Sequence, residues 1–346
     1  MSLCVVNFNG AAFLRPTLDA ALKNRRSFGE ILFIDNGSDD DSLAIAGEYD
    51  EVVTVALGEN RGAAAVRNAA IRRAASDLIL LLDSDVRLGD GCADALAAAL
   101  GERGAAIAMP QVLYEADPDT VQYDGADWHF MGLQIIEHPD TPSRRDGGGV
   151  REIGSVITAC CLIDRRKVGT EPFDEDFFIY LEDHDFGVRA RLRGFEILSV
   201  PGARCYHSEG TPGLSIRAIG SYSSLRVFCL IRNRWQFMAK NYQGRTLLVL
   251  APLLMLYEAA QLVIVIRNGW FREWARAAGW MARNARRVLR RRREVQRTRR
   301  CRDGDLMEAG EIPFRQELTS SPLQRRALAA LNRVVTTYWR YAGRFV

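Results

Sequence analysis

Short apolar runs alternate with longer stretches rich in Ala and Leu over the first 110 residues. The apolar runs cover residues 3–6, 31–34, 52–55, 78–82 and 106–109. The stretches between them cover residues 11–24, 40–49, 63–75 and 90–100. Unrelieved apolar runs are typical of strands buried on both faces, and the longer stretches have the composition of helices. The alternation therefore predicts an α/β fold with a Rossmann-like, mostly parallel, doubly wound sheet and helices on both faces.

The rest of the chain divides into an irregular part and a helical part. Residues 110–155 lack a clear period and contain several Pro and Gly residues, so we expect long loops over the site there. The elements expected next are a strand over 156–163, a helix over 174–193 and a strand over 195–200. From about residue 216 the pattern is largely helical. We therefore expect an α/β domain in residues 1–215 and a helical C-terminal region in residues 216–346.

Polar residues follow each of the first four predicted strands. They occupy residues 7–10, 35–39, 58–62 and 83–85. Any one such segment is explained by the preference of Asn, Asp and Gly for turns. In a doubly wound sheet, however, ligands bind beyond the carboxyl ends of the strands, where all four segments would gather. The pattern predicts a ligand site at this edge of the sheet.

Two carboxylates, Asp83 and Asp85, end the most apolar of these strands. In an extended segment residues i and i+2 lie on one face, so both carboxylates can converge on one cation, which would offset their repulsion. Oxygen ligands suit Mg²⁺ or Mn²⁺, which also bind substrate phosphates. His207 follows another predicted strand and is a third candidate ligand, with a packed structural histidine as the alternative. The sequence thus predicts a metal and diphosphate site.

A second acidic cluster, Glu182, Asp183 and Asp185, follows the aromatic and apolar run of residues 177–181. A surface helix with i,i+4 pairs such as Asp185–Arg189 would explain it without any function. Seated against the apolar run, however, a carboxylate would be desolvated, its pKa would rise, and it would become a better general base. The cluster is therefore a candidate for acid–base chemistry.

The C-terminal region contains one long apolar segment, residues 246–266, followed by fourteen arginines in residues 267–302. The segment has the length of a membrane span but includes Pro252, Glu258 and Gln261. With arginines behind it, we expect an in-plane membrane helix or a marginal span. A helical cap on the α/β domain or a dimer interface is the alternative, so a homo-oligomer stays open.

Cysteine usage and the start of the chain indicate the compartment. Seven cysteines occur without any CxxC pair, and no signal peptide precedes Met1. Both features are typical of a reducing cytoplasmic setting. Together with the apolar and arginine-rich segments, they predict a location at the inner face of the cell membrane, peripheral or anchored.

Six motifs in order carry a resemblance to a known family. They are VVNFNG, FIDNGSDD, ENRGAAAVRN, LLDSDV, FDEDFFIYLEDHDFGVRARLRGFEI and VPGARCYH. Their order, over roughly residues 3–240, resembles the inverting family 2 glycosyltransferases of GT-A fold, and most closely the rhamnosyltransferase and galactofuranosyltransferase-like group. The resemblance implies transfer of a sugar, such as rhamnose or another deoxysugar, from a nucleotide-diphospho-sugar to a hydroxyl of a glycan or lipid-linked acceptor, with Mg²⁺ or Mn²⁺ as cofactor.

The resemblance also implies roles for individual residues. The residues implied around the nucleotide sugar are Asn7, Phe8, Asn9, Asp35, Asn60, Gly62, Asn68, Asp83 and Ser84. Among them, Asp35 would bind the base or ribose, and Phe8 would stack on the base. Asp83, Asp85 and His207 would hold the metal. Asp183 would be the catalytic base, with Glu182 as the alternative carboxylate.

Other classes of protein fit the residues less well. A nicotinamide dehydrogenase would need GxGxxG after the first strand, and a sugar nucleotidyltransferase would need a Gly-rich loop where residues 7–10 stand. A processive polysaccharide synthase would need Gln-x-x-Arg-Trp, but Ile231 precedes Arg234-Trp235 in place of the glutamine. The arginines alone suggest nucleic-acid binding, which the acidic remainder of the chain argues against. The synthase and the nucleotidyltransferase remain as alternative functions.

Overall fold

The computed structural model describes residues 1–143, 148–208, 223–310, 312 and 322–346, with no description of the side chains of 323, 324 and 327. The chain divides into two units. Unit 1 comprises Met1–Ala126, Ile136–Arg191 and Phe195–Ser223. Unit 2 comprises Asp127–Ile135, Leu192–Gly194 and Ser224–Val346. The boundary predicted between residues 215 and 216 lies outside the described residues.

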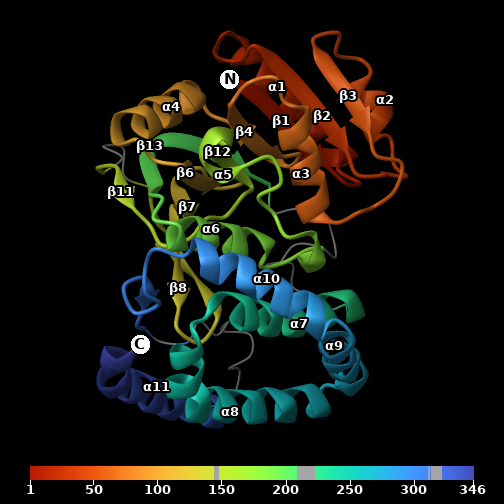
Figure 1. Ribbon diagram of the computed structural model, residues 1–346. Helices are drawn as coiled ribbons and strands as arrows, with labels where there is room; N and C mark the ends of the chain where they lie inside the picture. The colour runs from red at the N-terminus through yellow and green to blue at the C-terminus, as the bar shows by residue number, and fades with distance from the viewer. Residues whose placement is uncertain (144–147, 209–222, 311, 313–321) are drawn as a thin grey trace. The chain divides into compact units, whose positions relative to one another are not determined.

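The predicted strand–helix alternation is confirmed in the first part of unit 1 (Figure 1). The strands are β1 (Ser2–Asn7), β2 (Glu30–Asp35), β3 (Val52–Ala56) and β4 (Leu78–Asp83). The helices are α1 (Ala11–Lys23), α2 (Ser42–Ala46), α3 (Ala63–Arg73) and α4 (Cys92–Arg103). All four strands run parallel, in the order β3-β2-β1-β4. The chain therefore reverses direction across the sheet between β1 and β4, and this switch point is where doubly wound sheets bind ligands.

Antiparallel strands extend the sheet beyond β4. The neighbours in order are β12 (Cys160–Asp164), β6 (Ile107–Tyr114), β7 (Thr120–Tyr123) and β10 (Thr141–Pro142). The long strand β13 (Ile197–His207) runs parallel to β6 and also pairs with β5 (Val86–Leu88) and β11 (Arg151–Glu152). The sheet is thus mixed at this side and parallel from β3 to β4.

The interpretation of residues 110–155 as long loops is wrong. Strand β6 continues through Pro110, and β7 to β11 follow it. Pro110 lies within β6, opposite Val200 of β13, at a position where the sequence suggests a break. Buried polar side chains such as Gln122 and Asp124 also interrupt the apolar alternation, because they form specific hydrogen bonds in this half of the sheet.

The predicted helix over residues 174–193 is interrupted. A short 3₁₀ turn, η2 (Glu175–Phe177), precedes α6 (Glu182–Leu192). Between them Phe178, Tyr180 and Leu181 have φ values of 63°, 67° and 63°. Bulky residues rarely adopt the left-handed region, so the connection into α6 is strained. The other expected strands are found, although β12 covers only the end of 156–163 and β13 extends well beyond 195–200.

Unit 2 is largely helical, as expected. Its helices are α7 (Ser224–Asn241), α8 (Gly244–Arg267), α9 (Phe271–Arg283), α10 (Ala285–Thr298) and α11 (Pro322–Ala342). A small sheet pairs β14 (Met307–Glu308) with β8 (Gly125–His129), and β8 with β9 (Leu133–Glu137). Unit 2 contains β14 and residues 127–135 of the β8–β9 hairpin. Trp128 is fully buried and packs edge-on against Phe237 and Tyr242, with ring centroids 5.8 and 5.3 Å apart. This aromatic cluster forms the centre of the helical unit.

Helix α8 has one buried and one exposed apolar face. Over the described residues it is the one helix long and apolar enough to cross a membrane, and only 17% of its apolar window is buried. Leu248 and Met255 are 78% and 71% exposed. Glu258 pairs with Arg234 of α7 and accepts a hydrogen bond of 2.9 Å from Trp235 Nε1. The acidic residue of the predicted segment is therefore neutralised within unit 2 and leaves the exposed face apolar.

The arginine-rich segment has two roles in unit 2. Arg292 donates to the carbonyl oxygens of Ala239 and Tyr242, at 2.7 and 2.6 Å, and Arg299 donates to that of Asn241. These carbonyls lie at the C-terminal end of α7, where carbonyl groups have no partner within the helix. Arg291, Arg292 and Arg299 are partly buried, and the other eleven of the fourteen arginines are exposed. Part of the segment thus caps a helix, and the rest presents positive charge to the surface.

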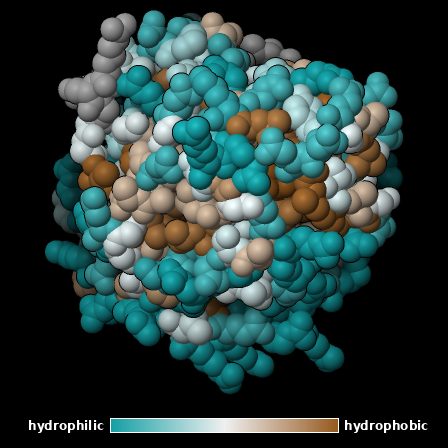
Figure 2. Space-filling view, turned by 90° about the horizontal axis from the view of Figure 1, so that it is seen from above, coloured by the Kyte–Doolittle hydropathy of each residue, from teal (hydrophilic) through white to brown (hydrophobic). Residues whose placement is uncertain are grey.

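Hydrophilic side chains dominate the face of the protein in Figure 2, with smaller hydrophobic patches between them. Apolar patches of this kind are normal on proteins in water. No disulfide joins the seven cysteines, all of which the structure describes, and six of them are buried.

Candidate functional site

The end of β1 and the end of β2 are joined by a buried hydrogen-bond network. Asp35 is fully buried and accepts hydrogen bonds from Asn7 Nδ2 (3.0 Å), from the backbone of Gly37 and Ser38 (3.1 and 2.9 Å), and from Ser38 Oγ (2.5 Å). Asp35 therefore fixes the loop after β2. Asn7 Oδ1 is buried and has no hydrogen-bond partner within the described residues, so it is an acceptor available to a ligand.

The turn after β1 is held in place by the same loop. Asn9 has φ 53° and donates its backbone N–H to Ser38 Oγ at 2.9 Å. Phe8 is half-buried. A Cβ on Gly10 would lie 2.3 Å from Asn7 Oδ1 and 2.5 Å from Ser84 Oγ. Glycine at this position thus allows the side chains of Asn7 and Ser84, from the two sides of the switch point, to approach the same place.

The polar loop after β3 is also organised by side chains. Asn60 Oδ1 accepts from Asn36 Nδ2 at 3.0 Å and from the N–H of Gly62 at 2.9 Å. Gly62 has φ +87°, and a Cβ there would lie 2.5 Å from the ring and the carbonyl oxygen of Phe178. Asn60 and Gly62 therefore connect the end of β2 to the strained segment before α6.

Asn68 is buried in α3, and its amide group bonds within the protein. Its Nδ2 donates to the carbonyl of Phe173 (2.9 Å) and to Glu175 (3.0 Å), and its Oδ1 accepts from Phe173 N–H (3.0 Å). In this structure Asn68 fastens residues 173–175 to α3. It positions the segment that leads to α6.

Arg67 lies at the centre of the acidic cluster. Its guanidinium donates to both carboxylate oxygens of Asp83, at 2.8 and 3.1 Å, and to Glu182 Oε1 at 3.0 Å. The side chains of Arg67 and Glu182 are each 7% exposed. Burial raises the pKa of Asp83, and the nearby Arg67 charge partly opposes that rise. One arginine thus joins the end of β4 to the start of α6.

Asp183 and Glu182 differ in exposure. Glu182 is buried and paired with Arg67, whereas Asp183 is half-buried, and its Oδ1 accepts the N–H of His184 at 2.6 Å. Burial raises the pKa of Glu182, and the adjacent Asp183 carboxylate raises it further. Burial also raises the pKa of Asp183, against the lowering effect of Arg67. Asp183 is therefore the more exposed carboxylate of the pair.

Asp85 pairs with His207 rather than with Asp83. His207 Nε2 lies 3.2 Å from Asp85 Oδ2, and its Nδ1 lies 2.7 Å from Gln122 Oε1. With Nδ1–H donated to Gln122, Nε2 and the carboxylate face each other, an arrangement that a cation between them stabilises. A carboxylate suits Mg²⁺ and Mn²⁺, and an imidazole suits transition-metal ions, so this pair fits Mn²⁺ better than Mg²⁺. Asp85 and His207 fit the implied metal, whereas Asp83 is held by Arg67.

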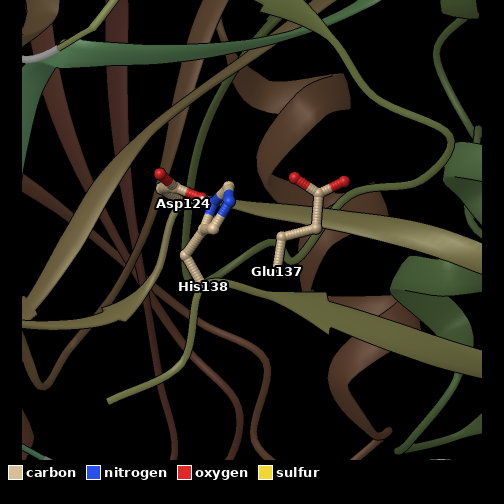
Figure 3. Close-up of side chains that lie close together, drawn as sticks. All are labelled: Asp124, Glu137 and His138. Atoms are coloured by element: carbon tan, nitrogen blue, oxygen red, sulfur yellow. Dashed lines mark hydrogen bonds and ion pairs between the residues drawn. The ribbon is translucent and has the colours of Figure 1, made fainter. Parts of the chain in front are cut away.

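Among the described residues, one group of three possible metal-ligand atoms lies within 4.8 Å of one another. This group does not include Asp85 or His207. It consists of Asp124, Glu137 and His138, shown in Figure 3. His138 Nδ1 is 2.8 Å from Asp124 Oδ1, and Arg151 pairs with both Asp124 and Glu137. The guanidinium already supplies the positive charge that the two carboxylates need, so we interpret this cluster as structural.

Comparison with known proteins shows which family and which solved structures this domain resembles. Residues 2–168 match the model of the family described as Glycosyl transferase family 2. An N-acetylglucosaminyl-diphospho-decaprenol L-rhamnosyltransferase of Mycobacterium tuberculosis (strain CDC 1551 / Oshkosh) is 27% identical over 205 residues, covering 52% of this chain and 66% of that relative. The chain therefore spans slightly less than two thirds of that relative's length.

Solved structures show the same fold. GalNAc-T7 with UDP, GalNAc and Mn²⁺ aligns with a TM-score of 0.53 at 18% identity, over 70% of this chain and 48% of that one. S. aureus TarS 1-349 in complex with UDP-GlcNAc aligns with a TM-score of 0.51 at 15% identity, over 98% and 91% of the two chains. Residues 2–168 therefore match the family 2 glycosyltransferase model, and the fold is the one that these solved glycosyltransferases share, a mostly parallel α/β sheet of GT-A type.

Sequence reasoning missed Arg67 and the strained segment before α6. Arg67 lies within the ENRGAAAVRN motif, but nothing in its spacing indicates a partner more than 100 residues away. The available signal was physical: Asp83 and Glu182 both follow apolar runs, and buried carboxylates need a cation. The contact of Gln122 with His207 is not predictable either, because the sequence suggests loops over residues 110–155.

Proposed function

We propose that this protein is a metal-dependent, inverting glycosyltransferase. It transfers rhamnose or another deoxysugar from a nucleotide-diphospho-sugar to a hydroxyl of a lipid-linked acceptor at the cytoplasmic face of the membrane. The name of the mycobacterial relative, which specifies rhamnose and a diphospho-decaprenol acceptor, supports both the sugar and the acceptor class. The apolar face of α8 and the exposed arginines support the membrane location.

One observation carries the chemical part of this proposal. Asp183 is a half-buried carboxylate with a raised pKa at the start of α6, next to a buried Glu182 that Arg67 already holds. In inverting transfer, a base removes the proton from the acceptor hydroxyl while its oxygen attacks the anomeric carbon opposite the leaving diphosphate. A raised pKa improves the carboxylate for that role. Arg67 and Glu182 position this base rather than perform its task.

The nucleotide binds, in this proposal, at the switch point between β1 and β4. Asn7 Oδ1 offers a buried acceptor to a donor group of the base or ribose, and Phe8 offers a half-buried ring for stacking. Asp35 and Asn60 act by holding the loops of this pocket in shape. Asp85 and His207 would hold the metal ion, which when bound stabilises charge on the leaving diphosphate.

Chelation should abolish activity. Since Asp85 and His207 supply only two ligands, the ion is expected to exchange with solution, and excess EDTA should reduce turnover to background, with Mn²⁺ or Mg²⁺ restoring it. His207→Ala should weaken metal affinity by roughly 10- to 100-fold, measured by Mn²⁺ titration of activity. Full turnover in EDTA would contradict metal dependence. A His207→Ala protein that loses thermal stability equally with and without metal would assign His207 a packing role.

The pH profile should reveal the raised pKa of Asp183. A base works only when deprotonated, so raising its pKa moves the acid limb of the profile upward. We expect turnover to fall at a pH clearly above the ordinary carboxyl value of about 4. The measurement is turnover between pH 4.5 and 8 at saturating metal and donor. The residual activity of Asp183→Asn should lack this limb, and a wild-type profile that is flat down to pH 4.5 would contradict the assignment.

Charge on the exposed face of α8 should release the protein from membranes. Leu248→Asp combined with Met255→Asp alters side chains that are 78% and 71% exposed, so core packing is preserved. We expect flotation with vesicles containing anionic phosphatidylglycerol to fall at least about tenfold, because two apolar anchors are lost. Val53→Asp, at a 53% exposed position on β3, is the matched control and should float normally. Unchanged flotation of the double variant would contradict membrane association through α8.

A further inference from the structure

An apolar groove lies in unit 2 where α8 meets α11 and the short helix η4 (Gly343–Phe345). Its volume is about 860 Å³, within the range of about 300–1,000 Å³ that is typical of sites for small ligands. Leu248, Val249 and Pro252 line it from α8. Val334 and Tyr338 line it from α11, opposite.

The wall of the groove offers carbon surface almost throughout. The hydroxyl of Tyr338 donates to the carbonyl oxygen of Val249, so its polar group has a partner within the protein. Thr337 is an exposed residue on the α11 side of the groove. A groove of this composition does not bind a nucleotide or a free sugar, whose polar groups would lack partners. It fits a hydrocarbon chain.

Large apolar side chains at the groove are exposed to solvent. Leu248, Val334, Tyr341 and Phe345 are 78%, 50%, 62% and 49% exposed. A contiguous apolar surface of this kind is unusual on a protein that meets only water, and it is typical of a ligand or membrane contact. Leu248 belongs both to the groove and to the exposed face of α8. A hydrocarbon chain in a membrane that contacts α8 can therefore enter the groove without exposure to water.

Two cations line the same groove. Arg333 of α11 and Arg344 of η4 are both exposed lining residues. Guanidinium groups bind phosphate oxygens well, in charge-assisted hydrogen bonds. The groove thus combines a hydrocarbon surface with positive charge, which is the complement of an amphiphile with a phosphorylated head.

We propose that this groove binds the polyisoprenoid chain of the lipid-linked acceptor, with Arg333 and Arg344 near its phosphate end. The proposal rests on the proposed function for the identity of the acceptor. It adds a binding site outside the glycosyltransferase domain and predicts that the enzyme distinguishes acceptors by chain length. The aromatic rings of Tyr338, Tyr341 and Phe345 suit the flat double bonds of isoprene units.

Direct binding tests the groove without any turnover. The probe is tritiated C55 polyprenyl phosphate in detergent micelles, bound to the full-length protein without donor or metal. Thr337→Trp fills the groove and should weaken probe binding at least tenfold, equivalent to about 1.4 kcal/mol. Ala329→Trp adds the same ring at an exposed position of α11 outside the groove and should bind like wild type. Equal affinities for wild type and Thr337→Trp would overturn the proposal.

Competition distinguishes an isoprenoid from a bilayer lipid. Unlabelled C55 polyprenyl phosphate should displace the probe, whereas phosphatidylglycerol at the same concentration should not. Equal displacement by both would show that the groove accepts bilayer lipid, and would overturn the proposal. The uncharged C55 polyprenol should bind less tightly than the phosphate to wild type, and as tightly as the phosphate to a variant with Arg333→Gln and Arg344→Gln. If the double variant still bound the phosphate more tightly than the polyprenol, Arg333 and Arg344 would not be the residues that contact the phosphate, and that part of the proposal would be wrong.

Chain-length dependence separates failure of this proposal from failure of the proposed function. Wild-type enzyme should show a KM at least tenfold lower for a C55 diphospholipid acceptor than for the same sugar on a C10 chain, with similar kcat. In Thr337→Trp the two KM values should converge. Equal KM values for the two acceptors in the wild-type enzyme would overturn the proposal that the groove binds the isoprenoid chain. The proposed transferase activity would remain supported. Probe binding that depends on Thr337, without transfer to any acceptor, would support the groove and contradict the function.

Discussion

Asp183→Asn should lower turnover by about 10²-fold or more while leaving the protein folded. Asparagine keeps the shape and can still accept the N–H of His184, but it cannot remove a proton from the acceptor. Because Asp183 is half-buried rather than part of the Arg67 ion pair, its replacement should not disturb that pair. The measurement is nucleoside diphosphate release at saturating acceptor, together with the affinity for the nucleoside diphosphate, which should be nearly unchanged.

Glu182→Gln is the matched variant for this test. It removes the charge that faces Arg67, so its main expected effect is on stability, with turnover affected less than in Asp183→Asn. An active Asp183→Asn beside an inactive but folded Glu182→Gln would reverse the two roles and assign Glu182 as the base.

Arg67→Met should destabilise the protein by about 3–5 kcal/mol at pH 7. Removing one partner of a buried ion pair leaves the other charge without compensation, and here two carboxylates, Asp83 and Glu182, lose the same cation. Without Arg67 the pKa of Glu182 in the folded state would rise further, so its protonated form would be favoured. The destabilisation should therefore be smallest near pH 4 and should grow as the pH rises. Urea unfolding at several pH values measures it.

Two variants control for the loss of an arginine. Arg72→Met removes an arginine from the same helix whose pair with Glu171 is exposed, and it should cost no more than about 1 kcal/mol. The double variant Arg67→Met, Glu182→Gln should be more stable than Arg67→Met alone, because the uncompensated charge of Glu182 is absent. Equal effects of Arg67→Met and Arg72→Met would contradict the central place of Arg67.

Local pattern was sufficient to predict the parallel half of the sheet. The first four strands are buried on both faces, so their apolar runs, such as Leu78–Leu82, are visible without knowledge of partners. The polar strand ends were predictable for the same reason, since they follow where the apolar runs stop. The antiparallel half was only partly predictable: β6, β12 and β13 show as apolar runs, whereas β7 carries buried Gln122 and is followed by buried Asp124, whose hydrogen-bond partners are distant in sequence.

Side-chain pairing in the site depends on contacts that no spacing indicates. The sequence suggests that Asp83 and Asp85 share one cation, whereas Asp83 pairs with Arg67 and Asp85 with His207. The chain turns between β4 and β5, so the alternation of an extended strand no longer applies to these two residues. Glu258 gives a second example: in sequence it interrupts an apolar segment, and in the fold it binds Arg234.

The most direct test of the account is the stereochemistry of transfer. The purified protein is incubated with Mn²⁺, a lipid-diphosphate acceptor and a panel of nucleotide sugars that includes the rhamnose donor, and the anomeric configuration of the product is determined by NMR. We predict that a deoxysugar is transferred with the configuration opposite to that of the donor, and that Asp183→Asn forms the same product far more slowly. Transfer with retained configuration would contradict the account. So would a failure of every donor in the panel to release its nucleotide.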